Sequence, residues 1–159
     1  MIQAITESSF TAYINTEANR IDTSVNSSHI RYLVKFTNDL DGSVQYAYST
    51  IHLVYDRYTK LNFNYNATPD VYTGDTKLIP SGYYKYEVYE VSWTGAVAIS
   101  AGNAPVTEDD VLPIGSTHGV VQGLVAIGKL NMTDKAGTEQ VQYTQHTEPS
   151  GTNYIWYGQ

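Results

Sequence analysis

The fold of this chain is decided by one stretch, Leu78-Ile79-Pro80-Ser81-Gly82-Tyr83-Tyr84-Lys85-Tyr86-Glu87-Val88-Tyr89-Glu90-Val91. Pro80 ends one strand, because proline has no N–H to donate to a ladder. Ser81 and Gly82 turn the chain, and the aromatic and β-branched residues that follow predict a long strand. Tyr84, at the start of that strand, is placed to bury its ring and return its hydroxyl to the backbone of the turn. This arrangement is a tyrosine corner.

The corner, made of Leu78, Pro80, Gly82 and Tyr84, predicts a two-sheet sandwich. In immunoglobulin-like and fibronectin type III-like domains such a corner joins strand E to strand F. Short runs elsewhere agree, and the predicted strands are residues 3–6, 9–15, 29–37, 43–53, 58–65, 76–79, 82–93 and 120–132. Most of these runs alternate apolar with polar residues, which is typical of antiparallel sheets with one wet face. We therefore predict an all-β, antiparallel Ig-like or fibronectin III-like β-sandwich.

The chain is predicted to divide into a sandwich domain, residues 1–132, and an extended C-terminal arm, residues 133–159. Within the domain, residues 95–119 are small and without pattern. A connection of this length is expected either to have a function or to be mobile. In the arm, residues 139–147 alternate, but Val141 and Tyr143 are their only large apolar side chains. Such a segment is too polar for a core, so it is expected to lie against another surface.

The amino-acid composition of the chain excludes several classes of function. The chain has no cysteine, which excludes disulfides, thiolate metal sites and cysteine nucleophiles. Its net charge is −7 with nine Lys plus Arg and no basic cluster, so we expect neither nucleic acid nor an anionic membrane as a partner. The chain start has no signal-peptide pattern, which predicts cytoplasmic synthesis. Fifteen tyrosines fit a β-rich core with one wet face, or a recognition surface of rigid aromatics.

The motifs of catalysis and metal binding are not found in the sequence. The four histidines, His29, His52, His118 and His146, share no metal-ligand spacing. No serine lies in a nucleophile elbow, and no glycine-rich loop has the lysine and helix that phosphate binding needs. Two oxygen-rich clusters, residues 38–42 and 108–110, are calcium candidates, with a hairpin turn and a solvated loop tip as the simpler explanations. We expect no catalytic residue, no metal and no cofactor.

Aromatic residues suggest binding instead. Side chains able to stack on sugars are Tyr83, Tyr89, Tyr154, Trp156 and Tyr157, although alternate tyrosines on a strand often pack on a neighbouring strand. The terminal group Tyr154, Ile155, Trp156 and Tyr157 must either return to the domain or dock on another subunit, since burying each large side chain is worth about 1.5–3 kcal/mol. We favour docking, because the polar stretch before the group spans up to roughly 60 Å when extended.

Four segments carry recognisable motifs, namely residues 32–39, 81–90, 128–130 and 154–158. Together they resemble small structural proteins of tailed bacteriophages, of the kind found in marine and gut Bacteroidetes phages. The resemblance covers most of the chain in order, except residues 16–28 and 95–119. It implies a virion component with an Ig-like sandwich, made in the host bacterial cytoplasm and present as a homo-oligomer or in many copies. It carries over no catalytic residue.

The expected function is a non-enzymatic structural protein of a tailed phage virion. A capsid-associated role, as an auxiliary or decoration protein on the major capsid protein, is preferred. The alternatives are a head–tail connector or fibre component bound to portal or tail subunits, and a carbohydrate-binding module used in host attachment.

Overall fold

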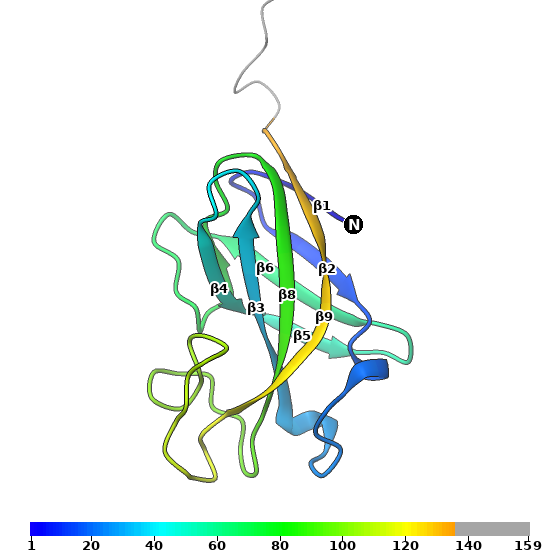
Figure 1. Ribbon diagram of the computed structural model, residues 1–159, viewed down its shortest axis with the longest axis vertical. Helices are drawn as coiled ribbons and strands as arrows, with labels where there is room; N and C mark the ends of the chain where they lie inside the picture. Colours follow the sequence, from blue (N-terminus) through cyan, green and yellow to red (C-terminus); the bar gives the residue numbers. More distant parts are fainter. Residues whose placement is uncertain (136–159) are drawn as a thin grey trace, which may run out of the picture.

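The computed structural model describes residues 1–135 and contains two β-sheets packed face to face (Figure 1). No α-helix occurs in this range; two short 3-10 turns, Glu17–Asn19 and Ser27–His29, interrupt an otherwise irregular segment. Within the same residues, no helix has the length and apolarity needed to cross a membrane. The prediction of a mostly β, sandwich-like protein is therefore confirmed.

The strands of the described range divide between the two sheets. The first sheet has the order β1-β9-β8-β3-β4, with β1 (Ile2–Ile5), β9 (Val120–Thr133), β8 (Gly82–Ser92), β3 (Ile30–Asn38) and β4 (Val44–Tyr48). The second has the order β2-β6-β5, with β2 (Phe10–Ile14), β6 (Thr59–Tyr65) and β5 (Ile51–Val54), and β7 (Asp75–Thr76) pairs with β6.

The prediction that the sandwich is antiparallel is wrong at two strand pairs. β1 pairs with β9 in parallel, and β6 pairs with β7 in parallel, so both sheets are mixed. Neither pair is joined by a hairpin, and β1 and β9 come from opposite ends of the described chain. Local turn chemistry, which sets the direction of hairpin strands, therefore gives no information about these pairs.

β3 lies inside the first sheet, between β8 and β4, and buries side chains on both of its faces. Its pairing with β8 runs without interruption from Ile30↔Ser92 to Asn38↔Tyr84. The predicted inward face is confirmed, because Ile30, Tyr32, Val34 and Phe36 all lie in the core between the sheets. That core also contains Phe10, Ala12, Ile14, Leu61, Phe63, Tyr84, Val88, Val125 and Leu130.

The predicted strand over residues 43–53 is wrong, because the chain changes sheets in its middle. β4 belongs to the first sheet and β5 to the second. Where they meet, the Ser49 hydroxyl accepts a hydrogen bond from the Asn62 N–H at 2.6 Å, and the Thr50 N–H donates to the Asn62 carbonyl at 3.0 Å. Alternation of side chains continues through this crossing, so the sequence pattern shows no break there.

The strand predicted over residues 76–79 is also shorter than expected. Only Asp75–Thr76 pairs with β6. The Lys77 N–H donates instead to the Gln45 side-chain oxygen at 2.9 Å, which takes it out of the ladder. Leu78 then enters the core and leads into the corner.

The corner has the geometry that defines a tyrosine corner. The Tyr84 hydroxyl donates to the Pro80 carbonyl oxygen at 2.8 Å, and the ring is buried in the main core beside β3. Burial also raises the pKa of Tyr84 above its ordinary value, so the hydroxyl keeps its proton and remains a donor. Gly82 has a φ of +135°, a conformation that favours glycine.

Residues 95–119, expected to have a function or to be mobile, pack against part of the outer face of the first sheet. They close a second core, whose buried members are Leu33, Tyr48, Val91, Trp93 and Ala104. The Trp93 indole N–H donates to the Thr117 carbonyl at 3.0 Å, and the Tyr48 hydroxyl donates to the Pro105 carbonyl at 2.8 Å. This long loop is therefore a lid of fixed position, and in Figure 1 it is the yellow-green segment at the lower left, below β4.

The polar segment before β3 is held by a buried carboxylate. Glu90 of β8 is fully buried, and its two oxygens accept hydrogen bonds from the backbone N–H groups of Ile21 at 3.0 Å and Asp22 at 2.7 Å. The Asn19 side-chain amide donates to the Val125 carbonyl of β9 at 2.9 Å. Charge-assisted hydrogen bonds of this kind fix an irregular segment that has few apolar side chains of its own.

Replacing Tyr84 with phenylalanine should destabilise the domain by about 1–3 kcal/mol. The substitution removes the hydroxyl that donates to the Pro80 carbonyl, while the ring stays buried. Urea unfolding of both proteins measures the difference. Tyr83→Phe is the matched control, since the Tyr83 side chain is exposed. Equal stabilities of Tyr84→Phe and the wild type would mean that the tyrosine corner does not stabilise the fold.

Candidate functional site

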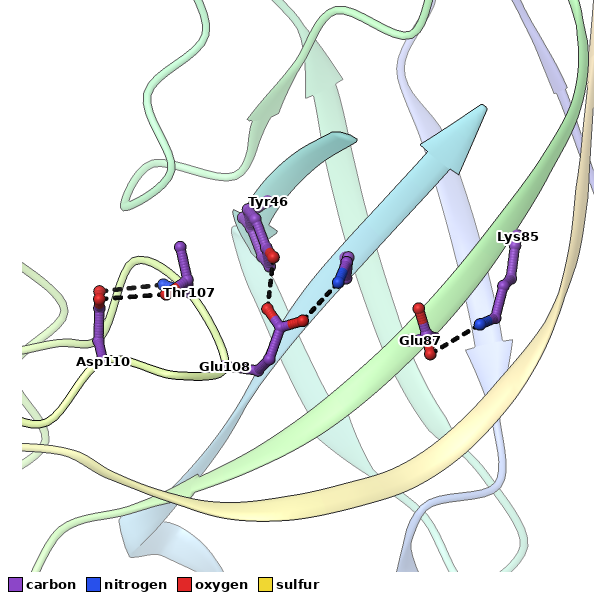
Figure 2. Close-up of polar contacts among 7 residues, drawn as sticks. Tyr46, Lys85, Glu87, Thr107, Glu108 and Asp110 are labelled. Atoms are coloured by element: carbon purple, nitrogen blue, oxygen red, sulfur yellow. Dashed lines mark hydrogen bonds and ion pairs between the residues drawn. The ribbon is translucent and has the colours of Figure 1, made fainter. Parts of the chain in front are cut away.

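One carboxylate fastens the lid to the first sheet. Glu108 pairs with the Lys35 ammonium of β3 and accepts a hydrogen bond from the Tyr46 hydroxyl of β4 (Figure 2). The hydrogen bond from Lys35 to Glu108 raises the pKa of Lys35, and burial raises the pKa of Tyr46 to about 12. Burial alone would raise the pKa of Glu108, but its hydrogen bonds with Lys35 and Tyr46 outweigh burial and lower it. The carboxylate therefore stays ionised and closed against the sheet at neutral pH.

The two calcium candidates are occupied by the protein's own donors. In the first, Asp39 pairs with Lys129, and Asp41 accepts from the Ser43 N–H at 2.9 Å. In the second, Asp110 accepts from the Val106 N–H at 2.6 Å and from Thr107, as Figure 2 shows for Thr107. Residues 1–135 contain no group of three or more His, Asp or Glu side chains able to hold a metal ion.

His52 is a histidine of β5 whose pKa is lowered. Its ring lies 5.3 Å from the Tyr32 ring, centroid to centroid, on the inner side of β5. Burial, with a smaller contribution from the Arg31 charge, lowers its pKa to about 4. His52 is therefore neutral at physiological pH and packs as part of the sandwich. His146 lies outside the described residues.

A cluster of three exposed tyrosines marks the outer face of the second sheet. Tyr13 of β2 and Tyr58 have ring centroids 5.3 Å apart, and Tyr58 and Tyr55 have centroids 4.9 Å apart. Tyr13 is 59% exposed, and even Tyr58, in the middle of the cluster, is 38% exposed. Two exposed apolar residues of β5, Ile51 and Leu53, lie on the same face of the second sheet. We call the three rings the tyrosine cluster.

A groove of ≈ 580 Å³ lies beside the tyrosine cluster, between β2 and β9. Its lining residues are Tyr13, Ile14, Asn15, Asn19, Tyr86, Leu124, Val125, Ala126 and Ile127. None of these side chains carries a charge, and Leu124 and Ile127 are exposed. Because Tyr13 belongs to both features, the groove and the tyrosine cluster adjoin on one side of the molecule. We call this the side groove.

Of the binding residues proposed from sequence, Tyr83 and Tyr89 lie among the described residues. Tyr83 is exposed, but Tyr89 packs against the second core. The rest of that set, Tyr154, Ile155, Trp156 and Tyr157, lies outside the described residues. Sequence reasoning missed the tyrosine cluster, although the inward alternation of Phe10, Ala12 and Ile14 already places Tyr13 outward. Nothing in the sequence pairs Tyr13 with Tyr58, because that contact depends on the register of β2 with β6.

Comparison of the chain with protein-family models, curated proteins and solved structures gave no match.

Acid should release the lid. The folded-state pKa of Glu108 is below its ordinary value of 4.5, so its stabilising contribution is complete above about pH 4.5 and is lost as the pH falls through the lower, folded-state pKa. Glu108→Gln should therefore be less stable than the wild type at pH 7, by about 1–2 kcal/mol given the partial solvent access of the pair. The two proteins should converge in strong acid.

Trp93, buried beneath the lid, is the reporter for this transition. A Trp156→Phe background removes the other tryptophan signal. Urea unfolding followed by Trp93 fluorescence between pH 7 and pH 3 gives the stability of both proteins. A difference between Glu108→Gln and its parent that does not change with pH would contradict the prediction.

Proposed function

We propose that this chain is a non-enzymatic structural protein that binds neighbouring protein subunits through the tyrosine cluster and the side groove. The observation that supports this most is the gathering of exposed apolar side chains on one side of the sandwich. Single exposed apolar residues are ordinary, but an adjoining groove and aromatic cluster mark interaction sites. Tyrosine is among the residues enriched at protein interfaces, because it offers large contact area and a polar tip.

Within this class, the proposed setting is the virion of a tailed bacteriophage, with the chain made in the host cytoplasm. Support comes from the resemblance of the sequence motifs, two of which, residues 32–39 and 81–90, lie on the paired central strands β3 and β8. A capsid-associated role on the major capsid protein is preferred over a connector or fibre role. A net charge of −7 favours solubility at high local concentration, as a multi-copy component needs.

We also infer that the sandwich is immunoglobulin-like. The order β2-β6-β5 corresponds to strands B, E and D, and β9-β8-β3-β4 corresponds to strands G, F, C and C′. The tyrosine corner then falls at the start of strand F, where this fold places it. These correspondences support the topology, and an experimental structure would test it.

The aromatic terminus is proposed to contribute to docking. Deleting residues 153–159 should abolish incorporation into particles while leaving the domain soluble, because the large apolar groups that contact the partner are removed. Particles purified from cells expressing either protein, followed by quantification of the chain in the particle fraction, measure the effect. Normal incorporation of the truncated chain would mean that the aromatic terminus does not contribute to docking.

The tyrosine cluster should contribute to the same contact. Tyr58→Ser should reduce incorporation by about tenfold, since a truncated aromatic anchor at an interface commonly costs more than 1 kcal/mol. Tyr83→Ser is the matched control, because Tyr83 is an exposed tyrosine on the other sheet. Equal incorporation of the two variants would mean that another surface makes the contact.

A second candidate function is carbohydrate binding for host attachment, and the exposed ring pair Tyr55–Tyr58 is the observation that favours it. If the chain is a carbohydrate-binding module, a glycan array should detect a specific sugar, and Tyr58→Ala should abolish the signal while Tyr83→Ala preserves it. An array without specific binding would leave the structural role as the proposal.

A further inference from the structure

Two strand edges border the side groove, and neither has a complete set of neighbours among residues 1–135. β2 pairs with β6 on one side only. β9 pairs with β1 only from Ile2↔Leu130 to Ile5↔Thr133, so residues 120–129 of β9 are paired with β8 alone. The groove lies between these edges, in the position that an additional edge strand would take.

One of these edges, that of β2, lacks the usual protection against pairing with another chain. Natural sheet edges are normally blunted by charged residues, proline or bulges. Neither Phe10–Ile14 nor residues 120–128 contain a charged residue or a proline. β9 is partly protected, since its register with β8 shifts twice and Asn19 occupies the Val125 carbonyl. β2 has an unbroken register with β6 and no such protection, so β2 is the better acceptor edge.

We propose that the side groove accepts residues 139–147 from a second copy of this chain as an added strand on β2. This proposal rests on the proposed function and names its partner as another copy. Residues 139–147 alternate, which suits a strand, and carry one formal charge, at Glu139, which matches the uncharged lining of the groove. The added strand would make main-chain hydrogen bonds to β2 and place alternate side chains, including Val141 and Tyr143, against Leu124 and Ile127.

A second copy fits this groove better than the chain's own arm. The arm begins at the opposite end of β9, where the Thr6 N–H donates to the Thr133 carbonyl at 2.9 Å and the Lys135 N–H donates to the Thr6 hydroxyl at 3.2 Å. From Lys135 back to Ile127 is roughly 26 Å along the strand. The six residues from Lys135 to Val141 span at most roughly 22 Å. Val141 of the same chain therefore falls short of the groove.

Cysteine cross-linking of the full chain tests the proposal, because the protein has no cysteine of its own. Leu124→Cys and Val141→Cys are made as separate proteins, mixed, and treated with a short bifunctional maleimide that tolerates small changes of register. A heterodimer is expected on a denaturing gel. Leu40→Cys mixed with Val141→Cys is the matched control, since Leu40 is 81% exposed in a turn away from the groove. Equal yields from both mixtures, or no heterodimer from either, would overturn the proposal.

The double variant Leu124→Cys/Val141→Cys shows whether the added strand comes from the same chain or from a second copy. Cross-linking within one chain, with a yield that does not change on dilution, would assign the groove to the chain's own arm and overturn exchange between copies. Sedimentation velocity provides the independent measurement. The wild type should associate with increasing concentration, and Tyr143→Pro should weaken association about tenfold, because proline cannot donate to a strand ladder. Tyr143→Phe should associate as the wild type does.

A wild-type chain that stays monomeric at every concentration would also overturn the proposal that two copies exchange a strand. Incorporation into particles distinguishes that failure from a failure of the proposed function. A monomeric chain that still enters particles leaves the structural role standing, whereas a chain that dimerises but never enters particles removes the structural role and keeps the strand exchange.

Discussion

The pairing of β3 with β8 is the interaction on which the rest of the structure depends. It joins nine consecutive residues of β3 to β8 at the centre of the first sheet. One face of this pair is buried by the second sheet, and the lid buries Leu33 and Val91 on the other face. A strand covered on both sides needs apolar residues at successive positions, and Tyr32, Leu33 and Val34 supply them. Burying two faces in a chain of this size also allows a stable domain without disulfides.

Covering the first sheet determines which surfaces remain for contact. The lid covers the part of the outer face around Leu33 and Val91 and is fastened by Glu108, so Tyr89 packs against the second core. The second sheet has no such cover within residues 1–135, and its outer face keeps the tyrosine cluster exposed. The side groove adjoins that face because β1 reaches only the last four residues of β9. Interaction surfaces thus arise where the fold leaves a layer and an edge incomplete.

Local chemistry in the sequence predicted the corner, the inward face of β3 and the long strand β8, because each depends on residues close together in the chain. Tyr84 and Pro80 lie four positions apart, and alternation alone orients Ile30, Tyr32, Val34 and Phe36. Features set by distant contacts were missed. The crossing at Ser49 depends on Asn62, the parallel direction of β1 depends on β9, and the lid depends on Glu108 meeting Lys35. The tyrosine cluster likewise required the pairing of β2 with β6.

Backbone hydrogen bonds hold the two ends of the lid, and its tip is exposed to solvent. The Gly95 N–H donates to the Ser116 carbonyl and the Gly119 N–H donates to the Asn103 carbonyl, both at 2.8 Å. Beyond these ties, Val111 and Ile114 point fully into solvent. Foreign peptides are tolerated best at exposed loop tips whose ends stay anchored. The stretch between Val111 and Ile114 is thus a natural insertion point, where a guest epitope or affinity tag would be presented outward on a rigid β scaffold without entering either hydrophobic layer.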